Sequence, residues 1–302
     1  MLRPLAQAAA LSLAVALAFP ATAQTQPPST TLAEFPNGAF LENLIVRADG
    51  TVIFTSYFDR TLMSLAPGGR PKVLARLPAH PVGLSEHGGG FVVSAHGKPF
   101  TAQPDFLSTN LVLELDRAGK VVRSTPAPDG RFLNGVLNDG RGFLIADSIA
   151  GAIWRYTLGG GVQPWLRAQA LEPDPATTPF RPGANGLKLH DGSVYVSNTS
   201  RGAISRVRLS AEGSPGALEP VASPGPVDDF AFDHRGVLYG TTHGDQLIAL
   251  SPAGEVSVVL SDGCDGCTSV ALRDGRLIVL TTGALLEGGK KPARVLSIPL
   301  KR

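Results

Sequence analysis

Four oxygen-bearing side chains occupy equivalent positions in a pattern that recurs along the chain. Each opens a short run of alternating apolar residues, as in "NGVLNDGRG" and "NGLKLHDGS"; they are Glu42, Asn134, Asn185 and Asp228. Hard cations such as Ca²⁺ take oxygen ligands from carboxylates, amide carbonyls and water. Two carboxylates also neutralise a divalent charge, whereas without a cation they would repel each other. The sequence therefore predicts one divalent cation on these residues, Ca²⁺ first, with Zn²⁺, Mn²⁺ and Mg²⁺ as alternatives.

A simpler interpretation applies to each position taken alone. Asn and Asp often precede a strand, because their side chains bond the local backbone. Glu42 differs, since Glu is not a turn former and this one stands among apolar neighbours. The common register of all four residues favours a metal site over four separate turns.

The pattern occurs six times and predicts the fold. Its copies open at Glu42, Val82, Asn134, Asn185, Asp228 and Thr268. Each copy continues through a turn into a second apolar run and a third, more polar one, for example "GFLIADS" and "AIWRY". Short β-rich runs that recur every 40–52 residues are typical of β-propeller blades. We therefore predict an all-β, six-bladed propeller in which the six opening residues ring one end of a central channel.

The last copy ends at Leu300 without room for a fourth strand. The stretch "TTLAEF" before the first copy would supply that strand and remove an exposed sheet edge. The prediction is thus one domain over residues 24–302, closed by an N-terminal strand.

The motifs resemble those of the gluconolactonase/regucalcin-like (senescence marker protein) family of six-bladed propellers. More distantly they resemble paraoxonases, diisopropyl fluorophosphatase and strictosidine synthase. The resemblance covers Thr30 to Pro299 and rests on the Glu of the first repeat, two Asn-Gly openings and "PVDDFAFD". It implies a cation held by Glu42, Asn134, Asn185 and Asp228, with Asp228 as general base and Asp229 as its partner or replacement. Asn43-Leu44-Ile45 stands where those lactonases have Gly-Pro and an aromatic residue, and Arg131 lies three residues before Asn134 instead of two. We therefore expect a lactone or related ester as substrate, without specifying a sugar.

Further polar side chains end the second runs and should point at the same mouth. They are Tyr57, His96, Asp147, Asn198 and His243, and His80 stands just before the second copy. An imidazole can accept a proton from water near neutral pH. His80 and His96 are therefore predicted as catalytic candidates beside Asp228. Solvated or structural roles for both are the alternative.

Cys264 and Cys267 form "CDGC" just before Thr268. Zinc would need two more soft ligands, and the sequence has no second Cys pair. A local disulfide at the rim of the ring is expected in an oxidising compartment.

The first 23 residues have the features of a secretory signal peptide. Arg3 precedes a short apolar stretch that ends in Ala21-Thr22-Ala23. Without these 23 residues the chain keeps 26 of its 27 Lys and Arg and all 25 Asp and Glu, which gives a net charge of +1. That balance argues against nucleic-acid or membrane partners. We expect a secreted or periplasmic monomer that binds a small molecule.

Taken together, the sequence predicts a metal-dependent hydrolase that acts on a lactone or related ester. A non-catalytic ligand-binding propeller with a structural Ca²⁺ is one alternative, and a strictosidine synthase-like condensing enzyme is another. The fold does not choose among them, because propellers host many functions.

Overall fold

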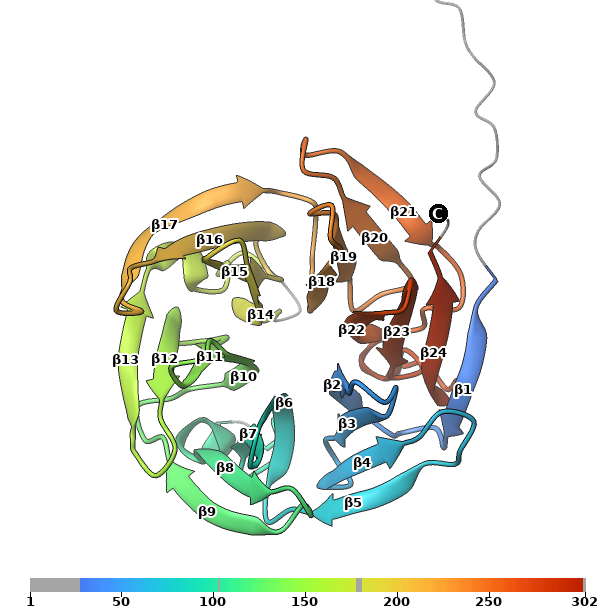
Figure 1. Cartoon of the computed structure of the whole chain (residues 1–302), viewed down its shortest axis with the longest axis horizontal. Helices are drawn as coiled ribbons and strands as arrows, with labels where there is room; N and C mark the ends of the chain where they lie inside the picture. The colour runs from blue at the N-terminus through green and yellow to red at the C-terminus, as the bar shows by residue number, and fades with distance from the viewer. Residues whose placement is uncertain (1–27, 103, 178–180, 301–302) are drawn as a thin grey trace, which may run out of the picture.

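Six four-stranded antiparallel sheets are arranged in a ring around a central channel, which confirms the predicted six-bladed β-propeller (Figure 1). The structure is a computed structural model and describes residues 28–102, 104–177 and 181–300. The predicted signal peptide, residues 1–23, lies outside the described residues.

Blades 1 to 3 follow one another in the chain, each with its strands in sequence order from the channel outward. Blade 1 comprises β2 (Leu41–Val46), β3 (Val52–Ser56), β4 (Thr61–Leu65) and β5 (Lys72–Arg76). Blade 2 comprises β6 (His80–His87), β7 (Gly90–His96), β8 (Asn110–Asp116) and β9 (Val121–Pro126). Blade 3 comprises β10 (Leu133–Asn138), β11 (Phe143–Asp147), β12 (Ala152–Tyr156) and β13 (Val162–Arg167).

Blades 4 and 5 repeat the arrangement, and blade 6 completes the ring. Blade 4 comprises β14 (Ala184–His190), β15 (Ser193–Asn198), β16 (Ala203–Leu209) and β17 (Pro215–Ala222). Blade 5 comprises β18 (Phe230–Phe232), β19 (Leu238–Thr241), β20 (Leu247–Leu250) and β21 (Val256–Leu260). Blade 6 comprises β22 (Cys267–Arg273), β23 (Arg276–Thr281), β24 (Ala293–Pro299) and β1 (Thr30–Phe35).

The N-terminal strand closes the ring, as the sequence predicted. β1 pairs antiparallel with β24, from Thr30 opposite Ser297 to Phe35 opposite Ala293. The first and last strands therefore lie side by side at the outer edge of blade 6 (Figure 1). This pairing satisfies the backbone of β24, which would otherwise be an open sheet edge.

Helix is confined to three short 3-10 turns among the described residues. They are η1 (Asp105–Ser108), η2 (Gln169–Leu171) and η3 (Leu285–Glu287). In the same part of the chain, no helix has the length and apolarity needed to cross a membrane.

The hydrophobic core consists of six clusters, one between each pair of neighbouring blades. Ile53 and Leu62 of blade 1, for example, pack against Leu84 and Phe91 of blade 2. The continuous burial of second strands such as β3, β7 and β11 follows from this arrangement, since both faces of each sheet meet a neighbour. The outer strands are partly exposed, which explains their more polar sequences.

The innermost strands share an irregularity where the repeats open. In five blades the register between the first and second strands shifts around the opening residue, as between Leu41 and Leu44 or between Ala184 and Leu187. A bulge redirects side chains at the end of a strand. The repeated bulge therefore turns the opening residues away from the regular alternation of the strand.

The Gly of each Asn-Gly opening permits close approach of neighbouring blades. A Cβ atom on Gly135 would lie 2.6 Å from the carbonyl oxygen of Asn185, and one on Gly186 would lie 2.9 Å from that of Asp228. Gly83 has the same relation to Asn134, at 2.3 Å. The Asn-Gly pair thus combines a polar side chain with the only residue small enough for the next blade to pack against it.

Hydroxyl groups from the second strands join the blades beside the ring. Thr55 Oγ1 accepts from the backbone N–H of Asn43 at 3.0 Å and donates to the carbonyl of Val82 at 3.0 Å. Equivalent hydroxyls lie in blades 2, 4 and 5 and donate to the next ring residue: Ser94 to Asn134, Ser197 to Asp228, and Thr241 to Thr268. This function of the small polar residues that end the second runs was not predicted from the sequence.

Candidate functional site

The six opening residues form a continuous ring at one end of the channel. Side-chain hydroxyls join each blade to the next by donating to backbone carbonyls at or beside the opening residues. Examples are Ser148 Oγ to Ala184 O at 2.8 Å and Thr268 Oγ1 to Leu41 O at 2.7 Å. The structure therefore brings together all four predicted ligands: Glu42, Asn134, Asn185 and Asp228. Val82 and Thr268 complete the ring.

Two carboxylate oxygens in this ring have no hydrogen-bond partner. Glu42 Oε2 and Asp228 Oδ2 are buried and unpaired, two of only four such side-chain atoms in the described residues. A buried carboxylate oxygen without a donor is costly, and buried polar atoms are rarely left so. The donor set and the unpaired oxygens fit a hard divalent cation with oxygen ligands. In the described part of the chain, no three His, Cys, Asp or Glu side chains are grouped closely enough to hold a metal ion. The proposed ring ligands comprise only two acids, and the other two are carboxamides.

The two carboxamides are held with their nitrogens engaged. Asn134 Nδ2 donates to Ser148 Oγ at 3.1 Å, and Asn185 Nδ2 donates to Thr199 Oγ1 at 2.9 Å. The two hydroxyls follow the second strands of the same blades. Because each nitrogen is occupied, the Oδ1 atom is the group left to accept from, or coordinate, a ligand in the channel.

Burial makes the charged form of both ring acids unfavourable. It is the main cause that raises the pKa of Glu42 well above its ordinary value, with the charge of Asp228 adding to it. Burial likewise raises the pKa of Asp228 to about 7, although the charge of His243 opposes it. A cation at the ring would reverse this preference, since bound cations dominate local electrostatics.

His243 is the imidazole most closely coupled to the ring. Burial alone lowers its pKa, but contact with Glu287 and the charges of Asp228 and Glu42 outweigh burial and raise the pKa to about 9. Its Nδ1 lies 3.6 Å from Glu287 Oε1. Its backbone is left-handed, with φ of 57°, which is uncommon for a residue other than Gly. The sequence placed His243 at the mouth, yet nothing in the sequence distinguished it from His80 and His96.

His80 lies at the start of β6 against Tyr57. Its Nδ1 is 3.0 Å from the Tyr57 carbonyl, and the two rings lie 5.1 Å apart. Since a carbonyl only accepts, Nδ1 carries the hydrogen and Nε2 is left as the basic nitrogen. Burial lowers the pKa of His80, and the nearby charge that contributes to the shift is Arg60 instead of a ring acid.

His96 is buried and fully bonded. Its Nδ1 is 2.9 Å from the Tyr57 hydroxyl and its Nε2 is 3.1 Å from the Leu133 carbonyl. Burial lowers its pKa to about 3. No ring nitrogen is left to take a proton from a substrate water, so these contacts favour the structural alternative over the predicted catalytic role.

The contacts of Asp229 favour a structural role over a catalytic one. It forms an ion pair with Lys188, and its Oδ2 accepts from Ser269 Oγ at 2.6 Å. Both carboxylate oxygens are therefore engaged. Asp229 stabilises the channel beside the ring, and Asp228 is left as the acid with a free oxygen.

Cys264 and Cys267 form the predicted disulfide at the start of β22. Both residues are fully buried against the cluster between blades 5 and 6. Asp265 between them forms ion pairs with Lys291 and Arg294. The disulfide and these ion pairs fix the segment that leads into Thr268.

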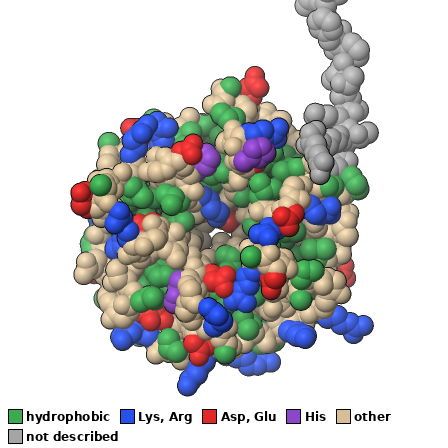
Figure 2. Space-filling model, viewed as in Figure 1, with side chains coloured by type: hydrophobic (Ala, Val, Ile, Leu, Met, Phe, Trp, Pro, Cys, Tyr) green, Lys and Arg blue, Asp and Glu red, His purple; other side chains and the backbone are tan. Residues whose placement is uncertain are grey.

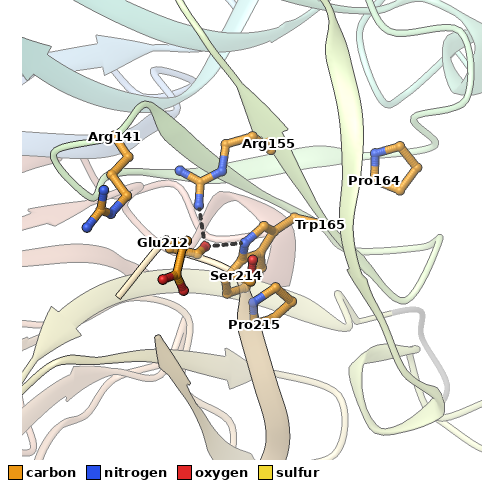
Figure 3. A pocket seen from close by; sticks show the side chains of 8 residues that line it. Arg141, Arg155, Pro164, Trp165, Glu212, Ser214 and Pro215 are labelled. Atoms are coloured by element: carbon orange, nitrogen blue, oxygen red, sulfur yellow. Dashed lines mark hydrogen bonds between the residues drawn. The ribbon is translucent and has the colours of Figure 1, made fainter. Parts of the chain in front are cut away.

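Among the described residues, two of the cavities lie outside the ring itself. One, of about 710 Å³, is the channel beyond the ring, lined by Leu44, Leu84, Val136, Leu187 and Val270 among others. The other, of about 400 Å³, lies between the outer parts of blades 3 and 4 (Figure 3). There Arg155 and Trp165 both donate to the carbonyl of Gly213, at 3.2 and 3.1 Å. Its polar groups are thus used to join the blades.

The face seen along the channel axis is hollowed at its centre (Figure 2). Lys and Arg side chains are spread around this face among acidic ones and do not gather in one basic patch (Figure 2). The ring, the hollow and the fold together define a six-bladed propeller with an oxygen-rich site at one end of its channel.

Solved structures with this fold include proteins of the kind that the sequence pattern resembles. A Xanthomonas campestris gluconolactonase is 16% identical, with a TM-score of 0.65 over 90% of this chain and 89% of that one. The calcium-binding protein regucalcin from Agrobacterium tumefaciens is 15% identical, with a TM-score of 0.62 over 90% and 96%. A Staphylococcus aureus virginiamycin B lyase is 16% identical, with a TM-score of 0.59 over 86% and 81%.

At these identities the likeness establishes the fold. No family model matches the chain, and no curated protein matches it by sequence.

Proposed function

We propose that this propeller is an exported, metal-dependent hydrolase of a lactone or related ester. The observation that carries the proposal is the pair of unpaired buried oxygens, Glu42 Oε2 and Asp228 Oδ2, in a ring with two carboxamides. Glu42, Asn134, Asn185 and Asp228 would hold the ion, with Ca²⁺ favoured by an all-oxygen donor set. When bound, such a cation polarises a carbonyl and offsets the negative charge that develops during hydrolysis.

Asp228 is the proposed proton acceptor. Its Oδ1 accepts from Asn185 Nδ2 at 2.5 Å, which fixes the carboxylate plane and leaves Oδ2 directed elsewhere. Burial raises the pKa of this carboxyl, and a bound cation would favour its charged form again, so that the carboxylate is available to accept a proton. Asp229, with both oxygens engaged, is a weaker candidate.

His243 is the proposed proton donor to the leaving oxygen. Glu287 lies beside Nδ1, so Nε2 is the nitrogen available to a substrate. In the reaction, a water oxygen bonds to the carbonyl carbon while its proton passes to Asp228. The acyl C–O bond then breaks, and the leaving oxygen takes the proton of His243. The product is the hydroxy acid from a lactone, or an acid and an alcohol from an ester.

Export of a monomer is part of the same proposal. Residues 1–23 have the features of a signal peptide, and a disulfide such as Cys264–Cys267 persists in oxidising compartments.

The test is hydrolysis of a panel of lactones, esters and phosphotriesters by purified protein. The proposal expects turnover that a chelator abolishes and added Ca²⁺ restores. Saturable binding without turnover would instead assign a non-catalytic ligand-binding role. Amine–aldehyde condensation would assign the condensing chemistry.

A further inference from the structure

The ring is polar on one side and apolar on the other. Val82 holds the second-blade position, where blades 1, 3, 4 and 5 carry an acid or an amide. It is buried with Phe40 and Tyr57 in a small cluster separate from the six between the blades. Phe40 stands two residues before Glu42, so this cluster begins immediately beside a predicted ligand.

The partly exposed members of this cluster extend it along the mouth. We name as the apolar wall Phe40, Phe58, Val82, Phe100 and Leu285, which come from blades 1, 2 and 6. The ring of Phe40 is 5.8 Å from that of Phe58 and 5.7 Å from that of Phe100. Phe58, Phe100 and Leu285 are each only half-buried. The wall therefore offers apolar contact surface at its edge.

Two contacts fix the wall relative to the ring. The backbone N–H of Phe100 donates to the Tyr57 hydroxyl at 2.8 Å, and that hydroxyl is bonded to the buried His96. On the other side, the ring of Phe40 lies 6.1 Å from that of His243, the imidazole coupled to Glu42 and Asp228. The wall is thus held beside His243, the proposed proton donor, by packing and hydrogen bonds that do not depend on a ligand.

We propose that the substrate carries an aromatic or branched apolar group next to its ester or lactone carbonyl, and that this group packs on the apolar wall. The inference rests on the proposed function. The side chains of Phe, Val and Leu offer no hydrogen bond, so the hydroxyl groups of a sugar lactone would lose water there without compensation. An aromatic group would gain offset or edge-to-face contacts with Phe58 and Phe100.

The experiment compares two δ-lactones of similar size, one phenyl-substituted and one polyhydroxylated. The expected result is a kcat/KM at least about tenfold higher for the phenyl lactone, a discrimination ordinary for an apolar pocket. Phe58→Ala should raise KM for the phenyl lactone about tenfold while kcat stays close to that of the parent, and Phe58→Leu should restore most of the loss. Leu158→Ala, at an exposed position beyond β12, is the matched control and should change neither constant.

Binding of the two corresponding lactams, measured by calorimetry, separates this inference from the proposed function. If neither lactone is hydrolysed but the phenyl lactam binds and Phe58→Ala weakens it, the wall is supported and the hydrolase proposal fails. If both lactones are hydrolysed with metal dependence but the polyhydroxylated one is preferred, the hydrolase stands and the wall inference is overturned. An equal effect of Phe58→Ala on both lactones would also overturn it. Melting temperatures of the variants exclude simple unfolding.

Discussion

Asn185 donates a hydrogen bond from Nδ2 to Oδ1 of Asp228 at 2.5 Å, across the boundary between blades 4 and 5. The bond fixes one oxygen of the carboxylate and leaves the other buried without a donor. Glu42 on the far side of blade 6 has an unpaired oxygen as well. The ring therefore holds two buried carboxylate oxygens without donors, an arrangement that a cation would stabilise.

Replacement of Glu42 by Gln should have opposite effects with and without Ca²⁺. In metal-free protein, Glu42→Gln replaces an acid whose charged form is disfavoured by burial and by Asp228, so the melting temperature should rise. With Ca²⁺ at a hundredfold excess over its dissociation constant, the parent should gain about 2.7 kcal/mol by mass action, and the variant should gain much less. Thermal unfolding with chelator and with Ca²⁺ measures both effects.

The matched control is Glu34→Gln, an acid-to-amide change at an exposed position of β1. It should leave the Ca²⁺ response unchanged. If purified parent protein carries no divalent ion and none can be titrated in, the metal site is refuted.

Asp228→Asn should separate catalysis from metal binding. The variant keeps an oxygen ligand and the shape of the side chain but loses the basic carboxylate. Turnover should fall by about 10²–10⁴-fold, the usual contribution of a general base, while Ca²⁺ affinity falls much less. Steady-state kinetics and metal titration on the same preparation provide the comparison.

His80→Gln and Asp229→Asn test the competing bases. His80→Gln should keep most of the activity, and Asp229→Asn should reduce stability through the loss of its ion pair with Lys188 more than it reduces kcat. Near-normal turnover by Asp228→Asn together with an inactive His80→Gln would move the base to His80.

The sequence was sufficient for the fold and the ring because both depend on register. Six copies of one pattern place Glu42, Asn134, Asn185 and Asp228 at one end of the channel whatever the details of packing. The closing strand at Thr30–Phe35 followed from the missing strand of the last copy. Both the ring and its closing strand follow from the repetition of one sequence pattern along the chain.

The roles of individual side chains could not be predicted in this way. His96 and His243 both end the second run of their repeats, and His80 stands just before the second copy. Yet His96 is buried between two bonds, His243 is coupled to the ring acids, and His80 is half-exposed. What separates them is contact with residues from other blades, such as Leu133 and Glu287, which no local pattern encodes. The apolar wall likewise gathers residues that are distant in sequence.

His96 should make the protein lose stability in acid. Its pKa is about 3 in the folded protein and near 6.5 when exposed, so between these values the unfolded state binds more protons. Its contribution to stability is therefore present above pH 6.5 and is lost as the pH falls toward 3, by up to about 1.4 kcal/mol per pH unit. Urea unfolding of the parent from pH 8 to pH 4 measures the loss.

His96→Gln provides the comparison. Its amide can accept from the Tyr57 hydroxyl and donate to the Leu133 carbonyl, but it does not titrate. The stability difference between parent and variant should shrink or reverse as the pH falls below 6.5. A difference that stays constant over that range would contradict a buried, neutral His96.

Removal of the residues before Asn37 should open the ring. β1 covers the edge of β24, and Ala33 is buried in the cluster that joins blades 6 and 1. Mature protein without β1 should unfold at a much lower denaturant concentration and aggregate through the exposed edge. An unchanged melting temperature would refute closure by this strand.

Gly135 of the first Asn-Gly pair should not tolerate even a methyl group. A Cβ there would lie 2.6 Å from the carbonyl oxygen of Asn185, so Gly135→Ala must push blades 3 and 4 apart at the ring. Overpacking of this kind costs about 1–3 kcal/mol, and the displacement should also weaken Ca²⁺ binding, because Asn134 and Asn185 are on either side of the contact. Gly161→Ala is the control, since a Cβ at Gly161 meets nothing within 4 Å. Chemical denaturation and Ca²⁺ titration of both variants make the comparison. If Gly135→Ala and Gly161→Ala have the same stability and Ca²⁺ affinity, the contact does not require Gly at position 135.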